Sequence, residues 1–524
     1  MNLSAWQHGR RLVPRWRSFA STVASGELAR PEAKTSAPKH TITPALIDLE
    51  KIHLPEKLFA AAEIVESAIV SGSEHLAVDA ARFILSNETH PTPLLQKQAA
   101  KILLRAGMGN EVPAIFLDTS LENAPKYRRR CLLNPRDALS WVELALHQTV
   151  NGHGKAAEHS MRIALNLSPN DRHVLRSASR LLLHREKREE AHSLIARNEA
   201  TPYDPWLLAA ETALASVVDL RSRHFKSSMR MLGSGANPRQ LTELAGAVGT
   251  TELIDGSRKK AKRLFVQSMF DPTANSLAQG EWAAPRLGVE LVSLDALRNV
   301  ADSYEAQAFH LYRESRLEDV PALCEQWASI DPYSIRPFEF GVGAAGQSGD
   351  FQTAVDLAKR GLARRPDSFL LLSGRAFASA SMDQIEEAKS ALNRSASLTR
   401  DGNDKCLLDA NRGLIAFREG RIDEGRYYYE KAISGFHQRK QHSLSSTARL
   451  YYAREALRLS LDDAKIIAEA AVEDARRNLG IENSRILNEI ETLLDLPLTD
   501  TSAPGARVEK SAPVKWVIPK LNFD

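Results

Sequence analysis

The stretch that decides the fold is ALSWVELALHQTVNGHGKAAEHSMRIALNLSPND, residues 138–171. It holds two runs with apolar residues at helical spacing, and the turn Gly152-His-Gly154 separates them. A step of 34 residues from Ala157 reaches Ala191, and the same step from Val320 reaches Ala354 and then Ala388. A period of this length predicts an array of helix pairs.

The first unit resembles a tetratricopeptide repeat. Residues at the positions that this repeat gives to W, L, G, A, F, A and P are Trp141, Leu144, Ala145, Ala157, Met161, Ala164 and Pro169. The resemblance implies an all-α protein, a right-handed α-solenoid of stacked helix-turn-helix repeats. It also implies a concave groove, lined by the first helix of each pair, that binds a protein or peptide.

The residue types at the repeat positions have a physical reason. Ala157, Ala191, Ala354 and Ala388 stand where the two helices of a pair approach most closely, and a larger side chain would push them apart. Gly425 holds the same place in a later unit. Pro169, Pro332 and Pro366 are expected to stop second helices, and Asn170-Asp171 and Asp367-Ser368 to cap the helices that follow.

The repeat pattern divides the chain into four parts. Residues 1–44 form a basic arm that we expect to be disordered, and residues 45–300 form N-terminal helical repeats, with clear units at 138–204 and 238–272. Residues 301–498 hold further repeats that end in three amphipathic helices at 443–459, 461–479 and 482–494. Residues 499–524 read as a flexible linker followed by an apolar segment.

Charge bears on the class of partner. The chain has a net charge of +4, but seven Lys or Arg and two Glu give residues 1–44 a charge of +5, so the rest sums to −1. A nearly neutral body is not typical of a nucleic-acid-binding protein, which needs clustered cations for phosphates. Nucleic acid is therefore a possible but not favoured partner, and a protein or peptide is the expected one.

The N-terminal arm allows three interpretations. Arg10, Arg11, Arg15 and Arg17, with Ser and Thr and no acidic residue before Glu27, are typical of a mitochondrial transit peptide, although Pro14 interrupts the helix that such a peptide needs. A docking motif built on Trp6, Trp16 and Phe19 is a comparable alternative, and a disordered arm is the interpretation that we expect. At the other end, Trp516 marks a second terminal motif, an apolar segment that we expect to bind another protein or to fold back onto the groove.

The remaining composition points to a cytoplasmic protein, with a mitochondrial location as the alternative. Cys131, Cys324 and Cys406 form no CxxC pair and suggest a reducing compartment. No apolar run approaches the roughly 20 residues that span a bilayer.

Two sets of residues are candidates for the groove. His173, Arg176 and Arg180 fall on groove-facing positions of one first helix, either as a solvated helix face or as a site for an acidic peptide or a phosphate backbone. Aromatic and acidic residues at the same positions of later units suit a protein partner, unless they pack on neighbouring helices; they are Glu305, Phe309, Tyr312 and Phe377.

Three motifs suggest chemistry but stand in the wrong context. Gly341, Gly343 and Gly346 spell GxGxxG inside an expected helix, whereas a dinucleotide site needs a strand before the motif. The histidines 147, 153 and 159 are not spaced as zinc ligands, and Ser257 in an SxxK string more plausibly caps a helix. We expect no catalytic residue, no metal and no cofactor.

The sequence thus predicts a non-enzymatic scaffold that binds a protein or peptide partner in the concave groove of a tetratricopeptide-like superhelix. The alternative is a nucleic-acid-associated or regulatory sensor that uses the basic groove patch and the basic arm. The residues name no particular partner and fix no oligomeric state.

Overall fold

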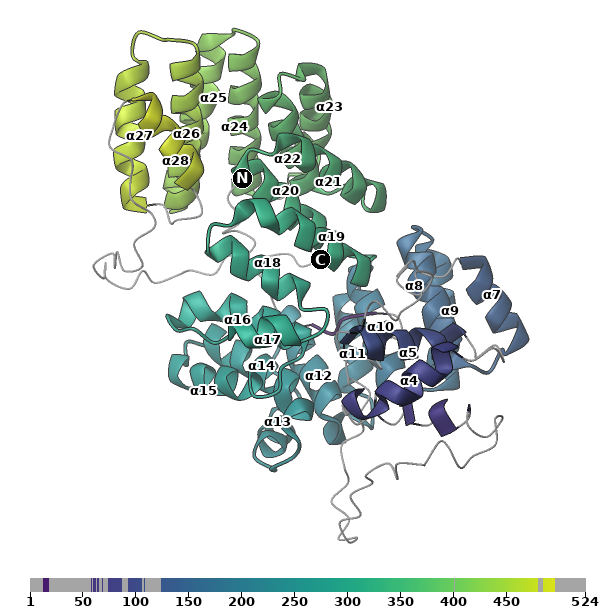
Figure 1. Ribbon diagram of the computed structural model, residues 1–524. Coiled ribbons are helices and arrows are strands. Elements are labelled where there is room, and N and C mark those ends of the chain that lie inside the picture. Colours follow the sequence, from purple (N-terminus) through teal and green to yellow (C-terminus); the bar gives the residue numbers. More distant parts are fainter. Residues whose placement is uncertain are drawn as a thin grey trace. The chain divides into compact units, whose positions relative to one another are not determined.

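The structure is a computed structural model. It describes residues 13–17, 74–86, 93–105, 108, 124–399, 401–478 and 484–494, with single positions between 58 and 68. Every regular element in these residues is helical, which confirms the predicted all-α class (Figure 1). The described residues divide into two compact units. Unit 2 holds residues 13–306 and 329–333, and unit 1 holds residues 307–328 and 334–494.

Unit 2 is an array of helix pairs that follows the repeat spacing. In chain order its elements are η2 (Glu74–Ala77), α4 (Val78–Ser86), α5 (Pro93–Arg105), α7 (Ala124–Leu133), α8 (Ala138–Val150), α9 (Gly154–Leu167), α10 (Arg172–His184), α11 (Arg188–Ala196), η4 (Thr201–Tyr203), α12 (Pro205–Val217), α13 (Phe225–Leu232), α14 (Pro238–Ile254), α15 (Arg258–Ser268), α16 (Ala274–Leu287) and α17 (Leu294–Asn299). Helix α18 (Tyr304–Arg313) begins in unit 2. The first helices α8, α10, α12, α14 and α16 contact one another in that order.

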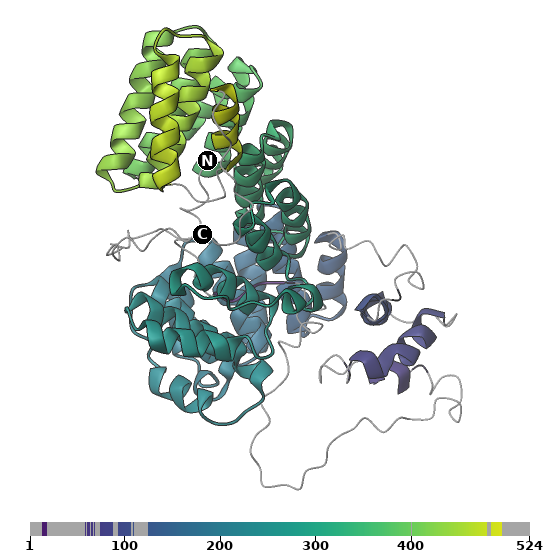
Figure 2. The same ribbon diagram turned by 60° about the vertical axis from the view of Figure 1, so that its left-hand side comes forward.

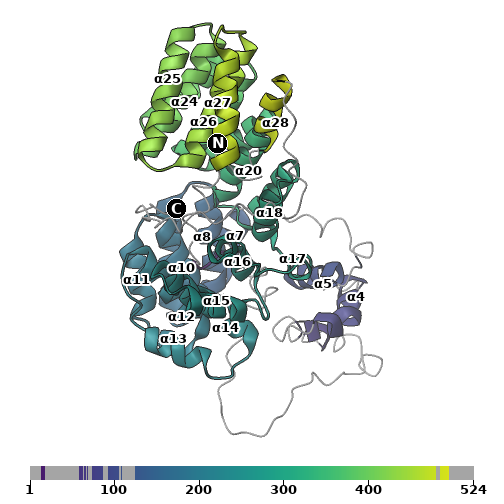
Figure 3. The same ribbon diagram turned by 90° about the vertical axis from the view of Figure 1, so that its left-hand side faces the viewer.

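Unit 1 continues the same architecture. Its elements are η5 (Leu317–Asp319), α19 (Val320–Ile330), α20 (Arg336–Ser348), α21 (Phe351–Arg364), α22 (Phe369–Ser381), α23 (Ile385–Ala396), α24 (Gly402–Arg418), α25 (Ile422–Gln438), α26 (His442–Arg458), α27 (Ala464–Asn478) and α28 (Ser484–Leu493). Helices α24 to α27 lie side by side (Figures 2 and 3). The last three helices match the three predicted at the end of the array.

The small residues and the caps act as the sequence predicts. Ala157, Ala191, Ala354 and Ala388 are all fully buried in helix-pair contacts. The second helices α9, α19 and α21 each end two residues before the expected proline. Asp171 caps α10 by accepting a hydrogen bond from the amide of Val174 at 2.9 Å, and Ser368 caps α22 in the same way.

One predicted cap is wrong. Ser257 is the N-cap residue of α15, but its side chain accepts no capping hydrogen bond, so only its position is as expected.

The glycines at 341, 343 and 346 lie inside α20, as predicted. His147 lies in α8, His153 precedes α9 and His159 lies in α9. In the part of the chain that the structure describes, no helix is both long enough and apolar enough to cross a membrane.

Two glycines of unit 1 offer a matched test of how tightly the helices pack. A Cβ at Gly361 would lie 2.6 Å from Leu371 Cδ1 and 2.8 Å from Phe338 Cβ, whereas a Cβ at Gly346 would meet Phe377 at an ordinary 3.5 Å. We expect Gly361→Ala to destabilise the protein by about 1–3 kcal/mol. Gly346→Ala should be neutral or stabilising by up to about 1 kcal/mol, because alanine favours a helix interior. Urea unfolding of both variants measures the difference, and equal midpoints would contradict the tight crossing at Gly361.

A buried carboxylate in unit 2 gives stability a pH dependence. Glu211 of α12 is fully buried. Burial raises its pKa, but hydrogen bonds from His192, from Ser222 and from the amide of Arg223 outweigh burial and lower the pKa below its usual value. The ionised form is therefore favoured in the folded state, and its contribution to stability is present above about pH 4.5 and is lost as the pH falls below.

We expect Glu211→Gln to flatten the fall in stability between about pH 5 and pH 3. Thermal unfolding across this range measures the effect, with Glu190→Gln, an exposed carboxylate on α11, as the control. A slope identical to that of the unchanged protein would contradict the assignment.

Candidate functional site

The predicted basic groove residues are buried. His173 and Arg176 of α10 are each 4% exposed and Arg180 is 6% exposed. The interpretation of this set as a solvated helix face is therefore wrong. We define the inner face of unit 2 as the surface formed by α8, α10, α12, α14, α16 and the start of α18.

Arg176 is held in a network that crosses this inner face. Its Nη2 donates to Glu243 Oε2 of α14 at 2.8 Å, and its guanidinium lies over the ring of Trp206 of α12 at 5.0 Å. Glu243 Oε1 in turn accepts a hydrogen bond from Asn275 Nδ2 of α16 at 3.3 Å. The network therefore joins four successive first helices and fixes their polar side chains.

The network ends on a segment of the chain that is far away in sequence. Asn275 Nδ2 also donates to the main-chain carbonyl oxygen of Val13 at 3.1 Å. Residues 13–17, Val-Pro-Arg-Trp-Arg, have no helical structure and lie on the inner face of unit 2. Val13 packs against the apolar cluster that holds Leu175, Leu207 and Leu214.

Trp16 is the anchor of this segment. Its side chain is fully buried and belongs to an apolar cluster with residues of α8, α9 and α10, among them Val142 and Ala178. Its ring lies 5.6 Å from the ring of Tyr333, centroid to centroid. Tyr333 is also covered by the guanidinium of Arg180 at 5.1 Å, and burial raises the pKa of Tyr333, so its hydroxyl stays neutral.

Two arginines flank the anchor, and each faces a carboxylate. Arg15 forms an ion pair with Glu305 of α18, a side chain that is 1% exposed. Arg17 forms one with Asp302 at 3.5 Å. Asp302 has a φ of 58°, in the left-handed region, and stands in the turn before α18. The site therefore presents an aromatic pocket between two negative charges.

This arrangement corrects the expectation for the N-terminal arm. Residues 13–17 are not a disordered arm, because they are packed against the repeats of unit 2. The sequence marked Trp16 as an anchor but did not indicate where it would dock. Trp6, Phe19 and Trp516 lie outside the described residues. The sequence did contain one signal for the docking site: the positive charges of Arg15 and Arg17 on either side of Trp16 are complementary to the negative charges of Asp302 and Glu305.

The predicted aromatic groove residues of unit 1 contact neighbouring helices. The ring of Phe309 lies 4.7 Å from that of Phe340 in α20, and the Tyr312 hydroxyl donates to Gln347 Oε1 at 3.2 Å. Phe377 packs edge-on against Phe351 and Tyr451. The alternative that these rings pack on neighbouring helices is therefore what the structure shows, and a role in contacting a partner stays a prediction.

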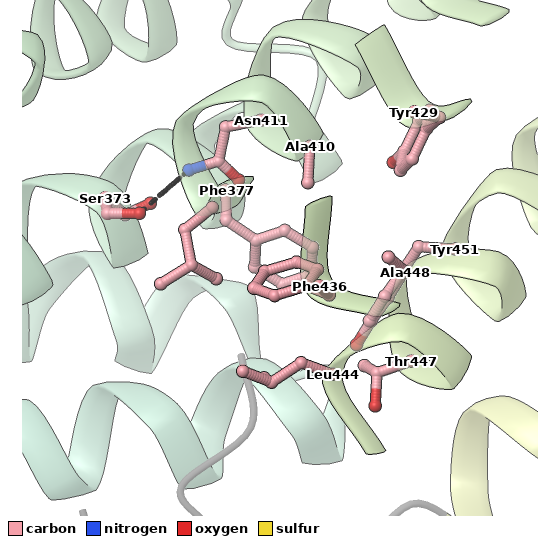
Figure 4. A pocket seen from close by; sticks show the side chains of 11 residues that line it. Ser373, Phe377, Ala410, Asn411, Tyr429, Phe436, Leu444, Thr447, Ala448 and Tyr451 are labelled. Atoms are coloured by element: carbon pink, nitrogen blue, oxygen red, sulfur yellow. Dashed lines mark hydrogen bonds between the residues drawn. The ribbon is translucent and has the colours of Figure 1, made fainter. Parts of the chain in front are cut away.

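A small pocket of about 50 Å³ lies beside Phe377 in unit 1 (Figure 4). Asn411 of α24 donates through Nδ2 to the Ser373 hydroxyl of α22 at 3.0 Å on one side of it. Rings from three helices complete its lining: Phe377, Tyr429, Phe436 and Tyr451. Its lining is therefore mostly apolar.

Comparison with known proteins finds likeness only among solved structures. No protein-family model and no curated protein matches the chain. The chain is similar to the crystal structure of the yeast Tom70, with 12% identity over 84% of this chain and 96% of that chain and a TM-score of 0.30. It is also similar to a chain in the crystal structure of the APC/C hetero-tetramer Cut9-Hcn1, with 12% identity, the same coverage and a TM-score of 0.28.

Identities and TM-scores this low transfer no function. The evidence for the fold is instead internal, because the helix pairs follow the spacing that the sequence shows. The fold is a tetratricopeptide-like helical repeat.

Proposed function

We propose that this protein is a non-enzymatic scaffold that binds an extended peptide segment of a protein partner on the inner face of unit 2. One observation carries the proposal: an extended segment, residues 13–17, already lies on this face, held by a buried tryptophan and two ion pairs. A face that holds one extended segment by side-chain anchors has the shape and chemistry to hold another.

The ionisable groups of the inner face support binding rather than catalysis. Arg176 is paired with Glu243, and Arg172 is paired with Asp204 at 2.5 Å. Groups engaged in this way fix the surface and its charge. A catalytic site instead needs a nucleophile or base directed at a substrate.

The alternative of a nucleic-acid-associated protein draws less support. It relied on Arg176, Arg180 and the basic N-terminal arm contacting phosphates. Arg176 is paired with Glu243 and Arg180 covers Tyr333. In the arm, Arg15 and Arg17 are paired with carboxylates. Salt dependence discriminates the two functions, because a complex led by phosphate contacts weakens steeply as ionic strength rises. A complex led by a buried aromatic anchor should weaken far less between 50 and 200 mM salt.

Site-specific cross-linking tests the proposed function. A photoreactive phenylalanine analogue replaces Tyr304, half-buried at the start of α18, or Tyr203, which is exposed on η4 and serves as the control. The tagged full-length variants are irradiated in extract of the source cell, with and without nuclease, and cross-linked proteins are identified by mass spectrometry. We expect a protein partner that cross-links at position 304, resists nuclease and is absent at position 203. Equal cross-linking at both positions, or partners that nuclease removes, would contradict the proposal.

A further inference from the structure

We infer that the inner face of unit 2 selects extended peptides with a cation–aromatic–cation pattern, and that residues 13–17 occupy this site as a built-in competitor. The inference rests on the proposed function and specifies its ligand. Three features of the site set the pattern: the pocket around Trp16, the carboxylates on either side of it, and the contact to the main chain at Val13.

The central position calls for a large aromatic side chain. Trp16 is fully buried between Tyr333 and the apolar residues of α8 and α10. Burying a tryptophan removes roughly 150–250 Å² of surface from water, and the burial of apolar surface is the main favourable contribution to such contacts. Alanine at this position would leave most of the pocket empty, so the aromatic residue supplies most of the affinity.

The flanking positions call for cations. Glu305 is 1% exposed and faces Arg15, and a carboxylate at this depth is costly unless a positive charge or several donors compensate it. Asp302 faces the other arginine, Arg17, at 3.5 Å. An acidic peptide would place negative charge against both carboxylates. The site therefore excludes the acidic tail that the basic residues of α10 suggested.

The N-terminal end of the site contacts the main chain. Asn275 donates to the carbonyl oxygen of Val13, a contact that any residue at this position can accept. Pro14 follows and fixes its own φ near −65°, which suits an extended backbone. The register of the peptide is thus set by a main-chain contact, to which the side chain of Val13 adds an apolar contact with the cluster that holds Leu175, Leu207 and Leu214.

The built-in segment satisfies the site incompletely. Among the residues that the structure describes, four buried donors of the segment find no hydrogen-bond partner: Arg15 Nη1, Trp16 Nε1, Arg17 Nε and Arg17 Nη2. A buried donor left unbonded destabilises the state that contains it, because it has lost its hydrogen bonds to water. A partner peptide that satisfies more of them has a free-energy advantage in replacing residues 13–17.

Residues 18–57 join the segment to the first described helix positions, so the segment competes as a tethered ligand. Covalent attachment turns its binding into an intramolecular event and raises its effective concentration at the site. A free peptide therefore binds the unchanged protein weakly and a protein with a weakened segment strongly.

The test uses the full-length chain and a fluorescein-labelled peptide of residues 11–19, followed by fluorescence anisotropy. The double variant Arg15→Ala/Trp16→Ala weakens the built-in segment, and we expect it to bind the peptide at least ten-fold more tightly than the unchanged protein. Adding Glu305→Gln to this variant should weaken binding at least ten-fold. Adding Glu318→Gln, an exposed carboxylate of η5, should leave binding unchanged.

Peptide variants check the pattern directly. Replacing the tryptophan by alanine, or the first of its flanking arginines by glutamate, should abolish binding up to 1 mM. The inference is overturned if the double variant loses its helical circular dichroism, because Trp16 would then be a fixed part of the core. It is also overturned if the folded variant binds no peptide, or binds the alanine and glutamate peptides as well as the original.

The two proposals can fail separately. A nuclease-resistant partner that cross-links at position 304 but is not displaced by the peptide supports the scaffold function and overturns the ligand pattern. Peptide binding without a cross-linked partner supports the ligand pattern and overturns the scaffold function.

Discussion

Replacing Glu243 by glutamine is expected to destabilise unit 2 by about 3–5 kcal/mol, because the change leaves Arg176 buried without its counter-charge. The two side chains are 3% and 5% exposed and their atoms lie 2.8 Å apart. Glutamine keeps the shape of glutamate and can still accept from Asn275. The change therefore removes the charge and keeps most of the packing.

Urea unfolding followed by circular dichroism measures this loss, and the midpoint should fall by about 1 M or more. Hydrogen exchange in peptides from α10 and α14 localises it to unit 2. The matched control is Glu252→Gln in the same helix, since Glu252 lies 3.8 Å from Lys260, whose side chain is 67% exposed. A pair with one largely exposed partner contributes about 1 kcal/mol at most, so an equal effect of the two changes would contradict the role of the buried pair.

The helical repeats could be predicted from the sequence because their causes are local. Ala157 and Ala354 recur at the same step, and a proline follows each second helix. These signals depend on residues within one helix pair, so a single chain displays them. The cap at Asp171 was predictable for the same reason, since capping needs only an oxygen three residues before its amide donor.

The candidate site could be predicted only in part, because its residues come from distant parts of the chain. The sequence identified Trp16, Arg176 and Glu305 as candidates separately and gave no indication that Trp16 and Glu305 belong to one site. The sequence of a helix places an arginine such as Arg176 on one face, but it is the same sequence whether that face contacts water or a buried glutamate. Only the fold, which places Glu243 two first helices further along, distinguishes these cases.

The division into units shows the same limit. The sequence placed a boundary between residues 300 and 301, where repeat register resumes, whereas the compact units divide after residue 306. Residues 329–333 also belong to unit 2, where Tyr333 contacts the ring of Trp16. A repeat pattern marks where helices begin but does not show which cluster each helix joins.

A buried glutamate in unit 1 provides the second large effect. Glu455 of α26 is fully buried and accepts hydrogen bonds from three arginines. Arg418 of α24 donates to both of its oxygens, at 2.8 and 3.0 Å, and Arg454 and Arg458 donate at 3.0 and 3.1 Å. Burial lowers the pKa of Arg418, but Glu455 and Asp383 together outweigh burial and raise it. The cluster depends on a single carboxylate for most of its compensation.

We expect Glu455→Gln to destabilise unit 1 by about 3–5 kcal/mol, because three guanidinium groups then repel one another around a neutral side chain. Hydrogen exchange in peptides from α24 and α26 measures the loss. The control is Glu473→Gln in α27, a carboxylate that is 75% exposed and lies 3.3 Å from Arg477. Its loss should cost about 1 kcal/mol at most.

Adding Arg418→Met to the glutamine variant separates charge repulsion from lost hydrogen bonds. If repulsion dominates, removing the positive charge of Arg418 should restore part of the stability. The two arginines that remain are more exposed, because the side chains of Arg454 and Arg458 are 10% and 39% exposed and that of Arg418 is 8% exposed. A further loss of stability would mean instead that the hydrogen bonds of Arg418 hold α24 against α26. Because a repeat array gains stability from contacts between neighbours, that loss would spread to the exchange rates of both helices.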